Sequence, residues 1–313
     1  MLLVDYPRFE RLPHNGTPRV GNEAVVHSTA GLVTLLEAAL GGSAFTIGAG
    51  YQAPLTVPFG LAVTAAFGAL GEADPLQDRW MVRSAAIDWQ SGARGDDAIT
   101  AQAIVERATG HDVFVAVTAR GSESGSLLHA SIRLVAMRGG RYAAIATTDL
   151  PPVAGSAFSP PDVVEPSRQV LHVDAGIPVR TEPPLLRLHP PRVLASGART
   201  ELAFEPDLLQ LLMHPVAGHI EPLGRRVHPL GGVPLGAALT TALAAAGEGD
   251  PDRPVRTRIQ RADATWFLPL PANAPWIART RQNIKSGALG AVVDVIVAGA
   301  RSAFTAGIEW TVA

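Results

Sequence analysis

Two stretches of the chain are apolar all round, without the polar stripe of a surface helix. Residues 57–75 read VPFGLAVTAAFGALGEADP, and residues 233–251 read VPLGAALTTALAAAGEGDP. Each has a proline near its start and ends in Gly-Glu-x-Asp-Pro, which is the punctuation of a helix. A helix that is apolar on every side is buried. The pattern therefore predicts two buried helices, at 57–72 and 233–248.

The two stretches are copies of one another. They lie 176 residues apart and agree at 11 of 19 positions, among them the V-P-x-G start, one threonine and the Gly-Glu-x-Asp-Pro end. Alanine matches come easily in this composition, so the other matches carry the weight. An internal repeat of this kind indicates a duplicated structural unit.

Each helix is followed by four runs of alternating apolar and polar residues with turn signals between them. They predict strands at 80–89, 98–107, 112–120 and 127–137, and at 255–267, 276–283, 290–297 and 303–312. Shorter strand candidates at 45–51 and 220–227 precede the helices, and helical stretches at 29–40 and 206–213 precede those. A helix that covers the apolar face of an antiparallel sheet satisfies both elements. We predict an α+β fold in which two antiparallel sheets each wrap a central helix.

The repeat also sets the expected domain organisation. We predict an N-terminal domain at 1–140, a proline-rich linker at 141–199 and a C-terminal domain at 200–313. The two domains should superpose. Their sheets should join into one continuous sheet with both helices on the same side, because an unpaired edge strand would otherwise be exposed on each half.

Composition and charge narrow the function. The chain has 313 residues, 47% of them hydrophobic and 17% charged, which is enough apolar material for a globular core. No run reaches the ~18–20 apolar residues of a membrane span, and the N-terminus lacks a signal-peptide layout, so we expect a cytoplasmic protein with no membrane partner. The absence of cysteine excludes disulfides and thiolate chemistry, and the scattered histidines predict no metal site. A net charge of −2 argues against a nucleic-acid surface.

Three segments resemble enzymes of the double-hotdog superfamily, which act on acyl-CoA or acyl-carrier-protein thioesters. RADATWFLPLPANAPWIARTRQ (261–282), and more loosely SAAIDWQSGARGDDAITAQA (84–103), look like the strand–turn–strand of acyl-CoA thioesterases. HPLGGVPLGAAL (228–239) looks like the histidine, Gly/Pro turn and helix start of hotdog dehydratases. The resemblance implies a tandem hotdog fold and a thioester substrate. It also implies no separate cofactor, with CoA or phosphopantetheine forming part of the substrate.

His228 is the leading catalytic candidate. The repeat aligns it with Gln52, so the position ahead of the helix is histidine in one half and glutamine in the other. A neutral imidazole near pH 7 can take a proton from water or from a substrate α-carbon. The alternative is that His228 ends a strand and bonds a loop carbonyl. Gln52 is taken as a substrate-binding candidate at the matching place.

Further candidates lie along the two repeated units. Gly60 and Gly236 are placed at helix N-termini, where amides could polarise a thioester carbonyl, or else they permit close helix packing. Thr64 and Thr240 could orient water, although a buried helical threonine more often bonds its own helix. The strand-ending aromatics Trp89 and Trp266 are substrate-binding candidates by resemblance.

Two sets of charged residues complete the candidates. Glu37 fits an L-x-x-L-x-D/E pattern like that of small hotdog thioesterases, in which the acid activates water; its alternative is a solvated helix residue. The arginines Arg256, Arg258, Arg261, Arg279 and Arg281 lie on neighbouring predicted strands. Arg279 and Arg281 share a face and could meet the phosphates of CoA, or they could simply point outward.

The leading functional hypothesis is hydrolysis of an acyl thioester. A 3-hydroxyacyl thioester dehydratase or enoyl hydratase ranks second, because residues 55–71 contain no acid to pair with His228. A non-catalytic acyl-binding protein with the hotdog fold is the third hypothesis. The expected partners are an acyl thioester and, as a further option, a second copy of the chain in a homodimer.

Overall fold

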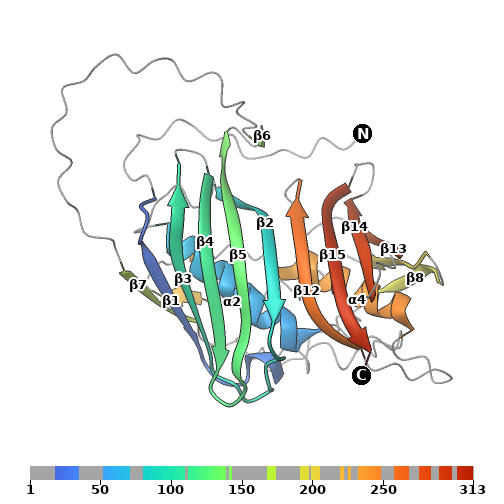
Figure 1. The fold of residues 1–313 in the computed structure, drawn as a ribbon, viewed down its shortest axis with the longest axis horizontal. Coiled ribbons are helices and arrows are strands. Elements are labelled where there is room, and N and C mark those ends of the chain that lie inside the picture. Colours follow the sequence, from blue (N-terminus) through green and yellow to red (C-terminus); the bar gives the residue numbers. More distant parts are fainter. Residues whose placement is uncertain are drawn as a thin grey trace, which may run out of the picture.

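The computed structural model describes the residues that carry the two repeated units. These are residues 18–34, 52–70, 80–109, 112–138, 141–142, 168–173, 191–196, 199–204, 219–221, 225–226, 232–247, 257–267, 275–282, 289–297 and 302–312. Within them the strands form one sheet, with two long helices lying behind it (Figure 1).

Both halves contain the same elements in the same chain order. The first half consists of β1 (Glu23–Ser28), α2 (Ala53–Gly68), β2 (Trp80–Trp89), β3 (Ile99–Ala108), β4 (Asp112–Gly121), β5 (Gly125–Arg138) and β6 (Arg141–Tyr142). The second half consists of β9 (Glu201–Phe204), α4 (Gly232–Ala246), β12 (Thr257–Trp266), β13 (Trp276–Gln282), β14 (Leu289–Val297) and β15 (Ser302–Val312). The eight predicted strands that follow the helices are all present.

The strand order repeats as well, which shows that the duplication is structural. It runs β1-β3-β4-β5-β2 in the first half and, in mirror sequence, β12-β15-β14-β13-β9 in the second. Antiparallel pairing of β2 with β12 joins the two halves. The predicted continuous sheet is therefore confirmed, and one sheet takes the place of two separate ones.

The β2–β12 seam has the register of an approximate two-fold axis. Ala86 pairs with Asp263 and Ile87 with Ala262, so equivalent strands meet near their equivalent centres. Each strand also carries an irregularity at the matching place, between Val82 and Ser84 and between Ile259 and Arg261. The chain thus has the internal symmetry of a dimer.

Both helices pack on the same face of the sheet, as predicted (Figure 1). α2 lies against β1, β3, β4 and β5, α4 lies against β13, β14 and β15, and the two helices also contact each other. All but two residues of α2 are buried, which agrees with its apolar sequence. The core fills the space between this helical layer and the sheet.

The first helix begins earlier than its pattern predicts. Sequence punctuation places the start at residue 57 with Pro58 in the first turn, whereas α2 starts at Ala53 and Pro58 lies inside it. Pro54, not Pro58, occupies the first turn, where a missing N–H costs nothing. In the second half Pro234 does lie in the first turn, and α4 begins at Gly232, one residue before its predicted start.

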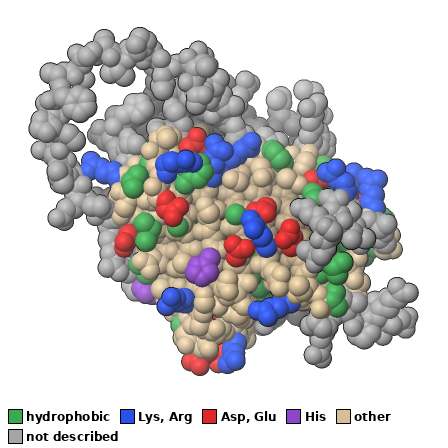
Figure 2. All heavy atoms as spheres, in the orientation of Figure 1, with side chains coloured by type: hydrophobic (Ala, Val, Ile, Leu, Met, Phe, Trp, Pro, Cys, Tyr) green, Lys and Arg blue, Asp and Glu red, His purple; other side chains and the backbone are tan. Residues whose placement is uncertain are grey.

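The face of the sheet away from the helices is polar. Charged side chains of both signs are spread over it, with acidic and basic groups adjacent near its middle (Figure 2). Arg261 on β12 illustrates this mixing, because it lies 3.4 Å from Asp263 and 4.0 Å from Asp88 across the seam. Alternation between this face and the core explains the period-two pattern of the sequence.

Three strands lie within the range predicted to be a linker, β6 and two more. β7 (Arg168–Val173) pairs in parallel with β1, and β8 (Arg192–Ala195) pairs with β9. β10 (His219–Glu221) and β11 (Arg225–Arg226) fall in the candidate 220–227, and β10 joins β7 at the first half's edge. The candidate strand 45–51 lies outside the described residues, and the domain boundaries remain a prediction. No described helix has the length and apolar character that crossing a membrane requires.

Candidate functional site

A cavity of about 190 Å³ opens at one end of the seam between the halves. The first half contributes the start of α2, the end of β2 and the loop after it. The second half contributes the start of β12 and one residue from the far end of α4. Its lining residues are Gln52, Pro54, Leu55, Trp89, Gln90, Ser91, Gly92, Leu243, Thr257, Arg258 and Ile259.

The inner proline of α2 shapes one wall of this cavity. Because Pro58 has no N–H, the carbonyl of Pro54 lacks its usual helical donor, and the amide of Ala93 bonds it instead at 2.9 Å. The indole Nε1 of Trp89 donates to the next carbonyl, that of Leu55, at 3.3 Å. Gly92 fits closely there, since a Cβ at that position would lie 3.2 Å from Pro54 Cβ. The loop after β2 is thereby fastened to the helix start.

Asp97 holds the other end of the same loop. Its buried carboxylate accepts hydrogen bonds from the amides of Arg94, Glu123 and Ser124 and from the Ser124 hydroxyl, at 2.6–3.1 Å. Burial raises the pKa of Asp97, but together these hydrogen bonds lower it by more than burial raises it. The pKa of Asp97 therefore lies below its ordinary value. Hydrogen bonds to an ionised carboxylate therefore hold the loop that lines the cavity.

Gln52, Thr257 and Arg258 are three of the polar residues that line the cavity. Gln52 forms the N-cap of α2, and its carbonyl accepts from the amides of Leu55 and Thr56. The Thr257 hydroxyl is buried and has no hydrogen-bond partner among the described residues, which is uncommon for such a group. The Arg258 guanidinium donates to the Gln90 carbonyl at 2.8 Å and forms no ion pair within the described part of the chain. The cavity thus combines an apolar interior with a hydroxyl and a cation.

A second hollow lies on the outer side of the same wall. It measures about 530 Å³, is wide open, and shares Trp89, Gln90 and Arg258 with the inner cavity. Asp88 and His129 on the helix-free face complete its rim. Although this hollow is larger, the inner cavity is the better candidate because enclosure by apolar walls is what retains a small ligand.

The opposite end of the seam carries the matching parts of the second half. Trp266 ends β12 opposite Phe304, as Trp89 ends β2 opposite Leu128. Its ring stacks on Phe59 at 6.5 Å and meets Phe304 edge-on at 4.9 Å. Whereas the Trp89 indole bonds the helix carbonyl of Leu55, the buried Nε1 of Trp266 has no hydrogen-bond partner.

Several predicted site residues have structural partners of their own. Thr64 and Thr240 each donate at 2.9 Å to the carbonyl four residues earlier, at Gly60 and Gly236. This is the helix-internal bond that the sequence analysis left as the alternative. Both hydroxyls are therefore engaged within their helices and lie away from the cavity lining.

The placement of Gly60 at a helix N-terminus is wrong, whereas Val233–Leu235, the neighbours of Gly236, do lie in the first turn of α4. Gly60 lies in the middle of α2, and Gly236 lies beyond the first turn of α4, which begins at Gly232. Their amides are consequently within the hydrogen-bonded part of each helix, where they are not available to an oxyanion. The placement of Gly60 failed because α2 starts early and because the sequence pattern assigned Pro58 to its first turn.

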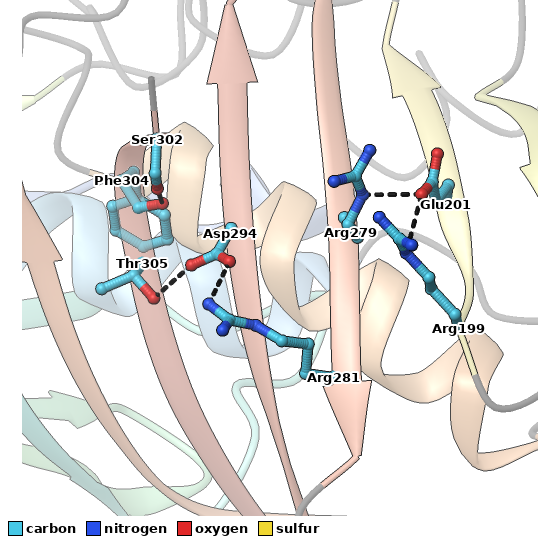
Figure 3. Close-up of polar contacts among 8 residues, drawn as sticks. All are labelled: Arg199, Glu201, Arg279, Arg281, Asp294, Ser302, Phe304 and Thr305. Atoms are coloured by element: carbon cyan, nitrogen blue, oxygen red, sulfur yellow. Dashed lines mark hydrogen bonds and ion pairs between the residues drawn. The ribbon is translucent and has the colours of Figure 1, made fainter.

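The two predicted phosphate-binding arginines are committed to carboxylates instead (Figure 3). Arg279 Nε lies 2.6 Å from Glu201, which also pairs with Arg199, and Arg281 lies 2.5 Å from Asp294. Asp294 in turn accepts from Thr305 at 2.9 Å. These side chains lie on the second half's outer strands, away from the seam, so Arg258 is the arginine that borders the cavity.

Gln52 and Trp89 are the predicted residues that the structure brings together, since both line the cavity. His228 and Glu37 lie outside the described residues. Sequence reasoning missed Thr257. An available signal was that the matching first position of β2 is the much larger Trp80. In the described part of the chain no group of three or more His, Asp or Glu side chains is arranged to hold a metal.

Comparison with known proteins places this geometry. No family model and no curated protein matches the sequence. A MaoC-like dehydratase has 12% identity and a TM-score of 0.51, over 94% of this chain and 98% of that one. A protein described as an oleoyl thioesterase from Lactobacillus plantarum has 15% identity and a TM-score of 0.50, over 84% and 90%. A protein with a hotdog fold from Alicyclobacillus acidocaldarius has 12% identity, with coverages of 82% and 86% and a TM-score of 0.49.

This chain has the hotdog fold. The predicted resemblance is confirmed at that level, and the match covers almost the whole length of the dehydratase. At such identities the likeness concerns the hotdog fold alone, because one fold supports many chemistries.

Proposed function

We propose that this hotdog protein hydrolyses acyl thioesters at the seam between its two halves. The observation that carries the proposal is the position of Gln52, which caps α2 and lines the cavity. The repeat aligns His228 with this position, so an imidazole stands in the second half where the first half has a carboxamide. The neighbour described as an oleoyl thioesterase supports an acyl thioester as the substrate class.

The reaction needs a base, and His228 is the residue proposed for it. A water oxygen bonds to the thioester carbonyl carbon while its proton passes to the imidazole. The carbon–sulfur bond then breaks, the sulfur leaves with its electron pair, and the imidazolium returns the proton to it. The products are a carboxylic acid and a free thiol, so no redox partner or metal enters the balance.

The test is thiol release from a panel of acyl-CoAs of increasing chain length, with wild type and His228→Gln compared. Thiol release by wild type and its loss in the variant supports the proposal. An absorbance change of an enoyl thioester without thiol release would replace it with the hydratase. α2 contains no acidic residue, which ranks that reaction lower because no carboxylate on this helix could assist the histidine.

A non-catalytic acyl-binding protein is the second candidate function, and one observation favours it. None of the described residues lining the cavity is a carboxylate or a histidine. Such a cavity can bind a ligand but cannot accept a proton from water near pH 7. Tight binding of an acyl-CoA with no thiol release from any chain length would support this candidate.

A further inference from the structure

The two ends of the seam differ most at the first inward position of the joining strands. Thr257 opposite Val312 begins β12, and Trp80 opposite Ala136 begins β2. A second matched pair of wall residues differs in the same sense, because Leu243 of α4 corresponds to Phe67 of α2. Small side chains therefore stand at the Gln52 end where large aromatic ones stand, buried, at the other.

This difference explains why an open cavity lies at the Gln52 end. An indole in place of the Thr257 side chain would occupy space that is now empty, whereas Trp80 is 5% exposed and packed into the core. The cavity is thus a consequence of two residues, Thr257 and Leu243, whose side chains are smaller than those of their counterparts Trp80 and Phe67.

The cavity also carries a hydroxyl without a hydrogen-bond partner and a cation without an ion pair among the described residues. A buried hydroxyl with no hydrogen bond costs about 1–3 kcal/mol unless something satisfies it. Thr257 contributes such a hydroxyl to the wall. Arg258 next to it borders the mouth, and its only hydrogen bond within the described residues is to the Gln90 carbonyl. A ligand with oxygen acceptors and a negative charge would complement both groups.

The size of the cavity limits the apolar part of that ligand. An apolar cavity of about 150 Å³ accommodates benzene, which has about six carbon atoms. The cavity here has about 190 Å³ and is walled by Leu55, Trp89, Leu243 and Ile259. A short unbranched acyl chain of similar carbon count fits this volume.

We propose that the cavity binds a short-chain carboxylate, with the carboxylate at Arg258, Thr257 donating to one of its oxygens and the chain between Trp89 and Leu243. The described lining of the site contains no histidine and no carboxylate. This site rests on the proposed function only in that such an acid is a product of thioester hydrolysis, which makes it a site for the reaction product.

Titration with hexanoate tests the proposal, followed by NMR through the indole N–H signals of the five tryptophans, with Trp89 assigned from a Trp89→Phe sample. Hexanoate should shift the Trp89 signal saturably. Arg258→Gln should weaken binding about tenfold to a hundredfold, because a charge-assisted hydrogen bond is lost. Thr257→Val should weaken it about two- to tenfold. Thr257→Trp, which copies the other end, should abolish it.

Matched controls separate the site from its surroundings. Arg261→Gln removes an exposed arginine of the same strand that pairs with Asp263, and it should leave hexanoate binding unchanged. Hexanol, which has the chain without the charge, should bind more weakly than hexanoate. Equal affinity for hexanol, full binding by Arg258→Gln, or a Trp89 signal that never moves would each overturn the proposal.

These outcomes are independent of hydrolysis. A protein that binds hexanoate at Trp89 but releases no thiol retains this site and loses the proposed activity. A protein that releases thiol while hexanoate fails to bind retains the activity and loses this site. If Thr257→Trp does not fold, Thr257→Val and Arg258→Gln still decide the matter, since neither adds volume.

Discussion

The two ends of the seam are built from the same parts and have become different sites. At one end the Trp89 indole bonds the Leu55 carbonyl, and Thr257 leaves an open cavity. At the other, Trp266 packs between Phe59 and Phe304 with its Nε1 unpaired, and Trp80 fills the position of Thr257. The two ends share the same backbone arrangement. A few side chains at equivalent positions leave a cavity at one end and fill the other with packed aromatic rings. The fold is shared between the ends, so function has to be sought in their differences.

The largest expected effect comes from making the two halves of the sequence alike at residue 228. His228→Gln copies the first half, and it should lower turnover of an acyl thioester by roughly 10²–10⁴, the usual contribution of a positioned acid–base group. The melting temperature should change little, because Gln52 is accommodated at the matching position. Steady-state thiol release with parallel thermal melts is the measurement. Full activity in the variant would remove His228 as the base.

The next effect concerns the loop after β2, whose counterpart in the second half lies outside the described residues. Asp97→Asn removes the charge that four hydrogen bonds stabilise, and it should destabilise the fold by about 1.5–3 kcal/mol at pH 7. Chemical denaturation measures this loss. Asp112→Asn is a suitable control, since that carboxylate forms a partly exposed pair with Arg133 and should matter less.

Acid should reveal the same residue. The folded-state pKa of Asp97 lies below its ordinary value of 3.8, so its contribution is present above that pH and is lost as pH falls through the lowered folded value. The stability of wild type should therefore decline more steeply than that of Asp97→Asn below about pH 4. Parallel curves for the two proteins would show that the carboxylate is not the group responsible.

A smaller difference should separate the paired tryptophans. Trp89→Phe deletes an N–H that bonds Leu55, whereas Trp266→Phe deletes one with no partner. Both lose ring volume, so the excess cost at Trp89 should be about 0.5–1.5 kcal/mol, the net value of one hydrogen bond. Urea denaturation of the two variants gives this difference directly. A larger loss at Trp266 would mean that its Nε1 is engaged by something that these contacts do not include.

The smallest effect should come from the arginines away from the seam. Arg281→Gln breaks an exposed pair with Asp294, and it should change stability by less than about 1 kcal/mol. The KM for an acyl-CoA should stay the same, because this side chain does not line the cavity. A marked rise in KM would restore the phosphate-binding role that the sequence analysis considered for Arg281.

The sequence alone determined the architecture of this protein. Uniformly apolar runs located the two buried helices, and alternating residues located the eight strands after them. The repeat of Val57 onward at Val233 indicated the duplication and the joined sheet. The strand predictions succeed because burial of one face of a sheet requires apolar residues at every second position of each strand. The asymmetry of Gln52 and His228 could likewise be read from aligned letters.

Only the tertiary structure decided where the cavity lies and which groups it exposes. Pro58 lies inside α2 because the loop amide of Ala93, far along the chain, bonds the carbonyl that the proline leaves without a donor. Arg279 and Arg281 form ion pairs with Glu201 and Asp294 on neighbouring strands. Thr257 and Trp89, from opposite sides of the seam, line the same cavity. Such pairings depend on strand register and on contacts between distant segments. Local patterns record which face a residue occupies but not which partner it meets there.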